Sequence, residues 1–392
     1  MIGRSDMSRS KAARFNALTE VGPTTTMGKL LRSFWQPVAL ADSVPKGSAR
    51  GLQLLGEEFT LYRGESGLPY LIGGRCAHRC TVLHTGWVQD DQIRCMYHGW
   101  RYDGTGQCTE MPAENHAKLQ NVQIAGYPVH EYRGLIFAYL GDGPPPAFEL
   151  PRKAALEDPG RHVFCVPPVI WDTNWFQLIE NSLDASHVSF VHVWGRVDRF
   201  GEEITTAIPQ LSYTETSAGI QQVAKRSETN VRVSDWTFPN NNHIIVPGPG
   251  PNDPWIDLFP WVVPIDEGHM IRFVLGSFPK SDAKTTARIT REYLVDYTPV
   301  DHVHDLFTRH RLPKLNTQQL TSTQDYVAAR GQGQIVNRLN ERLGQSDTGI
   351  AMLRKIFWRE LAAMRAGRPT KQWSRLNEAP PMPTPVRRTA NA

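Results

Sequence analysis

The sequence predicts an α+β protein, in which an N-terminal all-β domain is followed by a domain of antiparallel sheet and helices. Residues 52–140 hold short apolar runs separated by turn residues, which is typical of strands. A cluster of glycine and proline at residues 141–146 ends this region. Beyond it, the patterns predict helices over 171–194, several strands over 204–278 and helices in the remainder. We therefore expect an arm with a short helix over 1–34, a β domain over 35–146, a second domain over 147–378 and a proline-rich tail over 379–392.

The individual elements follow from local signals. Residues 1–23 are polar and are expected to be mobile, apart from a short helix over Arg14–Leu18. Thr26 is expected to cap a helix over Met27–Phe34, which ends before Pro37. Strands are predicted at Phe59–Tyr62, Tyr70–Ile72 and Leu135–Leu140. A C-terminal helix that ends at Gly367 is predicted from an apolar face made of Ile350, Leu353, Ile356, Phe357, Leu361 and Met364.

The composition is that of an ordinary globular protein. Of 392 residues, 40% are hydrophobic and 21% charged, and the net charge is 43 − 39 = +4. These values argue against disorder, and the absence of a basic run interleaved with aromatics argues against nucleic-acid binding. No apolar run reaches the roughly 18 residues of a membrane span, and the N-terminus lacks the apolar stretch of a secretory signal. Five cysteines argue against a disulfide framework, so the expected location is the cytoplasm.

Two cysteine–histidine pairs stand out in the predicted β domain. Cys76 and His78 lie in one glycine-flanked loop, Cys95 and His98 lie in a second, and 95 − 78 − 1 = 16 residues separate the pairs. Two loops that each offer one thiolate and one imidazole are suited to holding a metal centre from opposite sides. Zinc accepts two cysteines and two histidines in a tetrahedral site. A two-iron, two-sulfide cluster accepts the thiolates on one iron and the imidazoles on the other.

A second set of metal-binding residue types lies beyond the predicted domain boundary. Asp184, His187 and His192 occur in one predicted helical segment, and Glu180 precedes Asp184 by one turn, so the two carboxylates are expected to share a helix face. His187 and His192 are five positions apart, which separates them by about 140° on a regular α-helix. Either the helix is distorted or broken between them, or the two histidines have different roles. The alternative is that His187 and His192 are two buried, hydrogen-bonded histidines of a core helix and have no functional role.

The first constellation resembles the Rieske cluster motif of the ring-hydroxylating oxygenases. The resemblance rests on Cys76-x-His78, the sixteen-residue gap, and Cys95-x-x-His98 followed by Gly-Trp, and it extends over residues 35–114. It implies a Rieske [2Fe–2S] cluster in which Cys76 and Cys95 hold one iron while His78 and His98 hold the other.

The remaining cysteines are interpreted as structural. The Rieske subunits of respiratory bc complexes are similar but carry an extra cysteine pair that bridges the two loops. No cysteine adjoins His98 here, so that bridge is not expected, and Cys80 is interpreted as a lone buried thiol. Cys108 and Cys165 are interpreted as ordinary cysteines.

The second constellation is similar to the mononuclear-iron motif of the same family. The resemblance implies that His187 and His192 bind a mononuclear Fe(II). It also implies that Asp184 links His187 to a cluster histidine, His98, of the neighbouring subunit. A carboxylate hydrogen-bonded to a ligand imidazole orients that imidazole and raises its basicity.

The third iron ligand is expected to be a carboxylate from a distant element, because two imidazoles and one carboxylate leave positions open for O2. Residues 324–347 resemble the phthalate-dioxygenase-type branch, in which the leading aspartate is the ligand. Asp325 is therefore predicted as the ligand, and Asp347 is interpreted as a helix N-terminal residue. The other carboxylates considered are Asp301, Asp305 and Glu341, and a nearby group interpreted as a solvated helix face is His302, His304 and His310.

The resemblance also implies a fold, an activity and partners. The expected fold is a Rieske domain followed by a helix-grip catalytic domain. The expected enzyme is a terminal oxygenase that takes electrons from a reductase or ferredoxin, and originally from NAD(P)H. It uses O2 to hydroxylate or dihydroxylate an aromatic substrate, for this branch an aromatic acid. Oxidative O-demethylation of a methoxylated aromatic acid is the alternative outcome. A head-to-tail homotrimer is expected to bring the two kinds of metal site together.

An anionic aromatic substrate needs a cation in its pocket. Lys225, Arg226 and Arg232 lie on or next to a predicted strand of the second domain, and Arg226 is the favoured candidate.

Two other classes of protein stay open at this point. The chain is also compatible with a Rieske electron carrier whose second half is a docking module, and with an interaction protein that holds a structural zinc. Iron analysis separates a carrier from an oxygenase, and the colour of the purified protein separates an iron–sulfur cluster from zinc.

Overall fold

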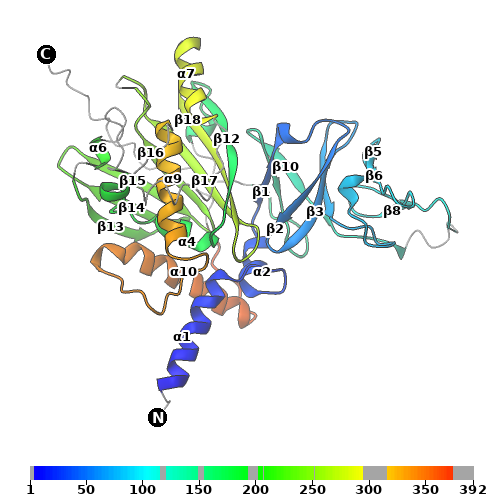
Figure 1. Ribbon diagram of the computed structural model, residues 1–392, viewed down its shortest axis with the longest axis horizontal. Coiled ribbons are helices and arrows are strands. Elements are labelled where there is room, and N and C mark those ends of the chain that lie inside the picture. Colours follow the sequence, from blue (N-terminus) through cyan, green and yellow to red (C-terminus); the bar gives the residue numbers. More distant parts are fainter. Residues whose placement is uncertain are drawn as a thin grey trace. The chain divides into compact units, whose positions relative to one another are not determined.

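The computed structural model describes residues 4–114, 121–148, 154–192, 202–205, 207–250, 252–294 and 316–373. The chain divides into two compact units (Figure 1). One unit comprises residues 21–148 with 263–266, and the other comprises the N-terminal 20 residues, residues 149–262 and the chain from 267 onward. The predicted proline-rich tail lies outside the described residues.

The unit of residues 21–148 is built mainly of short strands, as predicted. They form three sheets with the strand orders β1-β11-β10, β2-β3-β4-β9 and β5-β6-β7-β8. The elements are α2 (Thr26–Arg32), β1 (Gln36–Leu40), η1 (Ala41–Ser43), β2 (Ala49–Leu54), β3 (Glu57–Arg63), β4 (Pro69–Gly73), η2 (Leu83–Thr85), β5 (Trp87–Gln89), β6 (Gln92–Arg94), β7 (Arg101–Tyr102), β8 (Cys108–Glu110), β9 (Gly126–Tyr127), β10 (Val129–Tyr132) and β11 (Leu135–Ala138).

The two cysteine–histidine loops connect strands of this unit. The first follows β4 and the second joins β6 to β7. Each loop is closed by its own backbone. The Cys80 N–H donates to the Cys76 carbonyl at 2.9 Å, and the Gly99 N–H donates to the Cys95 carbonyl at 3.1 Å. Gly99 has φ +73°, a conformation that favours glycine, so this residue lets the second loop turn immediately after His98.

The second unit contains one seven-stranded sheet with the order β12-β18-β17-β16-β15-β14-β13, and antiparallel pairing joins successive strands from β13 to β17. Figure 1 shows α9 lying across this sheet. The elements are α1 (Arg4–Thr19), α3 (Ala154–Glu157), β12 (Arg161–Trp171), α4 (Trp175–Asn181), α5 (Val188–Val191), α6 (Glu202–Thr205), β13 (Gln210–Glu215), β14 (Gly219–Lys225), β15 (Val231–Thr237), β16 (Asn241–Val246), β17 (Ile256–Pro264), β18 (Met270–Pro279), α7 (Ala283–Tyr293), α9 (Thr317–Gly331), η4 (Gln345–Asp347) and α10 (Thr348–Arg365).

The strands of this sheet alternate in burial because successive side chains point to opposite faces. In β15, Arg232, Ser234 and Trp236 are buried while the residues between them are only partly covered. The ladder between β12 and β18 is interrupted between Val166 and Val169, where two prolines stand in β12.

Three local expectations need correction. The helix α1 extends over Arg4–Thr19 and is much longer than the short helix predicted over Arg14–Leu18. The side chain of Thr25, not that of Thr26, caps α2 by accepting from the Gly28 N–H. The segment that begins at Trp171 is not continuously helical, because Trp171 ends β12 and two separate helices follow.

The C-terminal amphipathic helix is confirmed as α10. Among the described residues, no helix combines the length and apolar character needed to cross a membrane.

Candidate functional site

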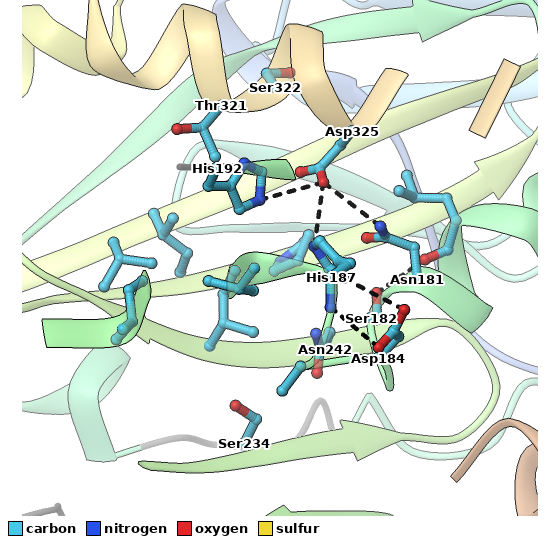
Figure 2. Close-up of a pocket in the computed structure, with 18 of the residues that line it drawn as sticks. Asn181, Ser182, Asp184, His187, His192, Ser234, Asn242, Thr321, Ser322 and Asp325 are labelled. Carbon is cyan, nitrogen blue, oxygen red and sulfur yellow. Dashed lines mark hydrogen bonds and ion pairs between the residues drawn. The ribbon is translucent and has the colours of Figure 1, made fainter. Parts of the chain in front are cut away.

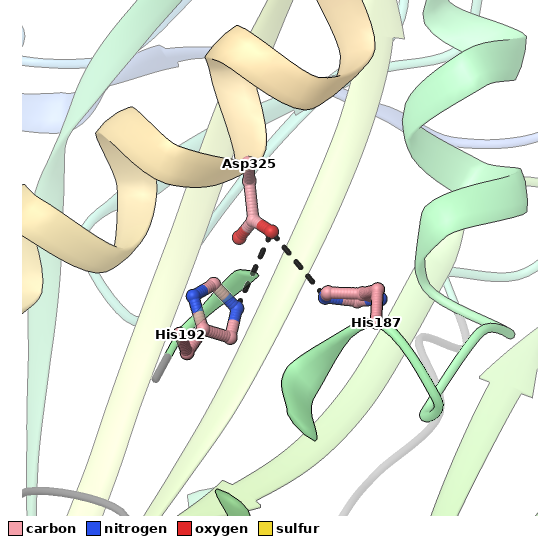
Figure 3. A group of neighbouring side chains, drawn as sticks. All are labelled: His187, His192 and Asp325. Atoms are coloured by element: carbon pink, nitrogen blue, oxygen red, sulfur yellow. Dashed lines mark ion pairs between the residues drawn. The ribbon is translucent and has the colours of Figure 1, made fainter. Parts of the chain in front are cut away.

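Three side chains that are distant in sequence converge in the second unit. His187 Nε2 and His192 Nε2 each lie 3.4 Å from Oδ1 of Asp325. The three potential ligand atoms all lie within 4.8 Å of one another, which is the spacing of groups that hold one metal ion. Figure 3 shows Asp325 reaching from α9 toward the two imidazoles. Two imidazoles and one carboxylate are the donor set of non-haem iron sites that leave positions open.

The local fold explains how two histidines five positions apart face the same point. Helix α4 ends at Asn181, and α5 is a single turn in which His187 is the N-cap and His192 is the C-cap. Asp184 shapes the bend just before α5, because its Oδ1 accepts from the backbone N–H groups of Ser186 and His187 at 3.0 and 3.3 Å. The helix is therefore broken between α4 and α5, which is one of the two alternatives that the spacing of His187 and His192 left open. The separation of about 140° that a regular helix would impose on the two histidines does not apply.

The expectation that Glu180 and Asp184 share a helix face is wrong. Glu180 points into a buried ion-pair network instead, where its carboxylate accepts from Arg338 Nη2 at 2.7 Å and from Arg354 Nε at 2.6 Å. Glu341 completes this network by accepting from Arg354 Nη1 at 2.7 Å. The network fixes the end of α4, next to the residues that face the triad.

Charge within the triad is mutually stabilising. Burial on its own lowers the pKa of His192, but the Asp325 carboxylate more than offsets that effect and the pKa is raised. For Asp325 itself, burial acts to raise the pKa, but His192 and His187 hold it far below its usual range. The carboxylate is therefore ionised and available as a ligand.

Three further side chains contact the triad. Oε1 of Gln324 lies 3.0 Å from Nδ1 of His192, and Asn181 Nδ2 donates to Asp325 Oδ1 at 3.5 Å (Figure 2). Asp184 Oδ2 lies 3.8 Å from Nδ1 of His187, which is an ion-pair contact that is too long for a hydrogen bond. Gln324 and Asn181 were not predicted as site residues. Their only signals are that Gln324 precedes Asp325 and that Asn181 lies about one helical turn before Asp184.

A cavity of about 140 Å³ opens beside the triad, between the sheet and helices α4, α5 and α9. Most of its surface is apolar. The apolar residues that line it are Val166, Leu178, Ala185, Val188, Ile204, Ile244, Val246, Leu258, Pro260, Val262 and Val274. The polar ones besides the triad are Asn181, Ser182, Asp184, Thr205, Gln222, Arg232, Ser234, Asn242, Arg272, Gln318, Thr321 and Ser322.

The predicted cationic residues occupy different positions. Arg232 lines the cavity, whereas Lys225 and Arg226 are not among the described residues that line it. Lys225 pairs with Glu228 at 2.6 Å on the surface, and Arg226 Nε donates to the Ala207 carbonyl at 3.1 Å. The position of Arg226 outside the cavity lining therefore does not support the prediction that this residue contacts a substrate.

The other candidate ligands are placed away from the triad or fall outside the described residues. Glu341 belongs to the Glu180 network, and Asp347 forms the N-cap of α10, as interpreted from the sequence. The residues outside the described part of the chain are Asp301, His302, His304, Asp305 and His310.

The loops of the β unit bring like groups together. Cys76 and Cys95 are each 2% exposed and belong to one core cluster, whereas the rings of His78 and His98 lie 4.4 Å apart nearer the surface. His78 also stacks on Trp100 with ring centroids 4.6 Å apart. Among the residues that the structure describes, none forms a hydrogen bond with the buried Nδ1 of His78. Two buried sulfurs on one side, two rings on the other and an unpartnered ring nitrogen fit a two-iron cluster.

Cys80 is exposed, so its interpretation as a buried thiol is wrong. Its backbone adopts φ +57°, which turns the residue at the tip of the first loop and directs its side chain to solvent. Cys108 is buried and Cys165 is partly buried.

A family model described as the Rieske [2Fe-2S] domain matches residues 34–128, which include both loops. The 5,5'-dehydrodivanillate O-demethylase oxygenase subunit of Sphingobium sp. (strain NBRC 103272 / SYK-6) is 32% identical over 95% of this chain and 86% of its own length. The phenoxybenzoate dioxygenase subunit alpha of Ectopseudomonas oleovorans is 30% identical over 89% of this chain and 85% of its own length.

The fold also occurs in solved structures. The oxygenase in an oxygenase–ferredoxin complex of carbazole 1,9a-dioxygenase superposes with a TM-score of 0.64 at 20% identity, over 96% of this chain and 97% of that one. The domain match favours the iron–sulfur cluster over a structural zinc in the Cys/His loops.

Proposed function

The chain belongs to the oxygenase subunits of the Rieske non-haem iron oxygenases, and from that premise we propose that it is a terminal oxygenase acting on an aromatic acid. It is an oxidoreductase that incorporates oxygen from O2, and its cofactors are a Rieske [2Fe–2S] cluster and a mononuclear iron. When bound, the cluster supplies single electrons, and the mononuclear iron activates O2. The observation that carries the proposal is the convergence of His187, His192 and Asp325 on the wall of a mainly apolar cavity.

We propose that His187, His192 and Asp325 hold the mononuclear iron. Gln324 accepts from Nδ1–H of His192 in this arrangement, which leaves Nε2 of that ring free to bind the metal. Asp325 is ionised, so no proton has to leave it before metal binds. The apolar walls exclude water from the space next to the metal and hold an aromatic ring there.

We propose that Cys76 and Cys95 bind one iron of the cluster and that His78 and His98 bind the other. The pairing of thiols inside the core and of rings near the surface supports this division. The unpartnered Nδ1 of His78 supports its role as a ligand atom.

Asp184 is proposed to receive electrons from a cluster histidine of a neighbouring subunit and to pass them toward His187. Its Oδ1 is occupied by backbone N–H groups, while Oδ2 faces the His187 ring at 3.8 Å. This role requires a head-to-tail ring, which we propose to be a homotrimer. The mass of the purified protein in solution, measured by light scattering, tests the assembly.

The substrate class and the electron donor are proposed from the relatives. Both curated relatives carry names of enzymes that act on aromatic acids, one by O-demethylation and one as a dioxygenase. The carbazole oxygenase is recorded with a ferredoxin, which supports a ferredoxin or reductase as donor.

The five free cysteines support a cytoplasmic location. The cavity of about 140 Å³ is close to the roughly 150 Å³ of an engineered cavity that holds benzene, so a single ring fits it.

A single-turnover experiment tests this function. The purified protein is chemically reduced and given O2 with a panel of aromatic carboxylates and aryl methyl ethers, and the products are identified by mass. Gain of two oxygens and two hydrogens indicates cis-dihydroxylation, and gain of one oxygen indicates monohydroxylation. Formaldehyde with loss of a CH2 unit indicates O-demethylation, the alternative that the dehydrodivanillate relative favours.

Iron analysis on the same sample separates the oxygenase from an electron carrier. A chain with a cluster and a mononuclear site binds about three irons, and a carrier binds about two. Reoxidation without any product, together with about two irons per chain, would contradict the proposal.

A further inference from the structure

The cavity beside the triad is lined by two arginines whose surroundings differ. Arg272 has several partners. Its Nη2 donates to Ser322 Oγ at 2.7 Å, its guanidinium lies 5.0 Å from the ring centroid of Trp171, and the negative charge of Asp325 acts on it. Arg272 therefore has a hydrogen bond, a ring contact and a nearby carboxylate within the protein.

In the described part of the chain, Arg232 has no such partners. It is 8% exposed, and its Nε is buried without a hydrogen-bond partner in the described part of the chain. The charge that acts on it is the like charge of Arg226. Burial, with Arg226 adding to it, lowers the pKa of Arg232 to about 10, so the guanidinium remains charged at neutral pH. A buried charge without a counter-ion is costly, and an anion entering the cavity would remove that cost.

The register of the sheet explains why Arg232 and Arg226 interact but face different surroundings. Arg232 pairs with Ala224 across β14 and β15, and Arg226 follows two positions after Ala224, on the same face of the sheet. Arg226 lies where β14 has ended, and its N–H bonds to the Asn230 carbonyl in the turn. It adds positive charge behind Arg232 without lining the cavity.

The cavity wall around Arg232 combines polar side chains with the mainly apolar lining. Gln222 and Ser234 lie on the same sheet face and line the same wall. Arg232 lines the same cavity as His187, His192 and Asp325, so an anion bound to Arg232 shares that cavity with the triad. A volume of about 140 Å³ leaves room for one ring against the apolar walls.

We propose that Arg232 is the specificity-determining residue that binds the carboxylate of a single-ring aromatic acid and so holds the ring beside His187, His192 and Asp325. This inference rests on the proposed function and assigns its substrate-recognition contact. A planar guanidinium with two donor edges matches a carboxylate, so replacement by a neutral amide removes a charge-assisted contact.

Binding to the oxidised holoenzyme, which does not turn over without a reductant, tests the inference. Calorimetry measures the affinities of benzoate and 3-methoxybenzoate and of the matched neutral probes benzamide and 3-methoxybenzamide. We expect the wild-type protein to bind each acid at least about tenfold more tightly than its amide, because hydrogen bonds to charged groups are the stronger ones. Arg232→Gln is expected to weaken acid binding about 10- to 100-fold and to leave amide binding within about threefold.

Two further variants keep the test independent of folding. Arg226→Gln removes the neighbouring guanidinium and is expected to change acid binding by less than about threefold, because Arg226 does not line the cavity. Arg232→Lys is expected to restore part of the acid affinity, since it returns the charge without the planar fork. Cluster absorbance and iron content are measured for every variant, and both are expected to match the wild-type protein.

The inference is overturned if the wild-type protein binds acid and amide alike, binds none of the four probes, or loses as much acid affinity in Arg226→Gln as in Arg232→Gln. The single-turnover experiment keeps the two proposals apart. Oxygen incorporation into neutral substrates, with no effect of Arg232→Gln, rejects the carboxylate contact and leaves the oxygenase function standing. Acid binding that depends on Arg232 without any oxygen incorporation rejects the oxygenase function and leaves the binding contact standing.

Discussion

The hydroxyl group of Tyr102 is expected to set part of the reduction potential of the cluster. It lies 3.3 Å from Sγ of Cys76 and accepts from the Ala77 N–H at 3.1 Å. Burial, with the neighbouring Cys76, raises the pKa of Tyr102, so the hydroxyl keeps its proton. A thiolate that holds iron can only accept, and the tyrosine is therefore the donor. Tyr102→Phe removes this donor to Cys76, together with the acceptor of the Ala77 N–H, and keeps the ring in the core.

The expected change follows from the charge added on reduction. One extra electron increases the negative charge on the cluster and its sulfurs, so a donated hydrogen bond stabilises the reduced state more than the oxidised state. A hydrogen bond contributes about 0.5–1.5 kcal/mol. For a one-electron couple, 59 mV corresponds to about 1.4 kcal/mol. Removing the bond therefore lowers the potential by about 20–60 mV.

A redox titration followed by the visible absorbance of the cluster measures this shift. Tyr62→Phe is the matched control, because Tyr62 is fully buried in the same core and its hydroxyl donates to the Asp91 carbonyl at 3.1 Å, not to a cysteine. The control is expected to keep the wild-type potential within error. An unchanged or raised potential in Tyr102→Phe, or an equal shift in both variants, would refute the reasoning.

Three further changes have defined outcomes. Glu180→Gln removes the negative charge that two buried guanidinium groups pair with, so it is expected to lower the free energy of unfolding by about 3–5 kcal/mol, measured by thermal unfolding. The exposed control Glu228→Gln is expected to lower it by at most about 1 kcal/mol. Asp325→Asn is expected to lose the mononuclear iron while cluster absorbance persists; full iron content would contradict its role as a ligand. The hydrogen bond from Arg359 lowers the pKa of Glu215 below its ordinary value of 4.5, so this contribution to stability is present above pH 4.5 and is lost as the pH falls through the lowered value. The difference in unfolding temperature between wild type and Glu215→Gln should therefore narrow below pH 4.5, and a gap that widens there would contradict this.

Features encoded by local sequence could be predicted. Each Cys/His pair lies within one short loop, so the spacing within the pair places one thiol and one imidazole side by side. The pairing of His187 with His192 was harder, because a regular helix separates them. The chain bends between α4 and α5, where the Asp184 side chain accepts from the N–H groups of Ser186 and His187, and local spacing does not reveal this bend. Asp325 could be chosen only through resemblance, because its position depends on how α9 crosses the sheet.

The differences between expectation and structure come from features set by tertiary structure. Which of Arg226 and Arg232 lines the cavity depends on where β14 ends, because Arg226 lies in the turn after this strand and Arg232 lies within β15. Cys80 was expected to be buried because thiols usually are, but its left-handed backbone conformation at the loop tip turns it outward. Glu180 was read as part of a continuous helix, and its buried arginine partners lie more than 150 positions later in the chain.

The two prolines in β12 bear on how copies of this chain can associate. β12 is the first strand in the order of the seven-stranded sheet, and Pro167 and Pro168 stand where its ladder with β18 is interrupted. A strand from another chain that approached this edge would meet two residues without N–H donors and a local irregularity in the backbone. Continuous extension of the sheet from copy to copy is therefore blocked at this point, which protects the edge against fibrous aggregation. Assembly that uses this side of the unit has to rely on side-chain surfaces.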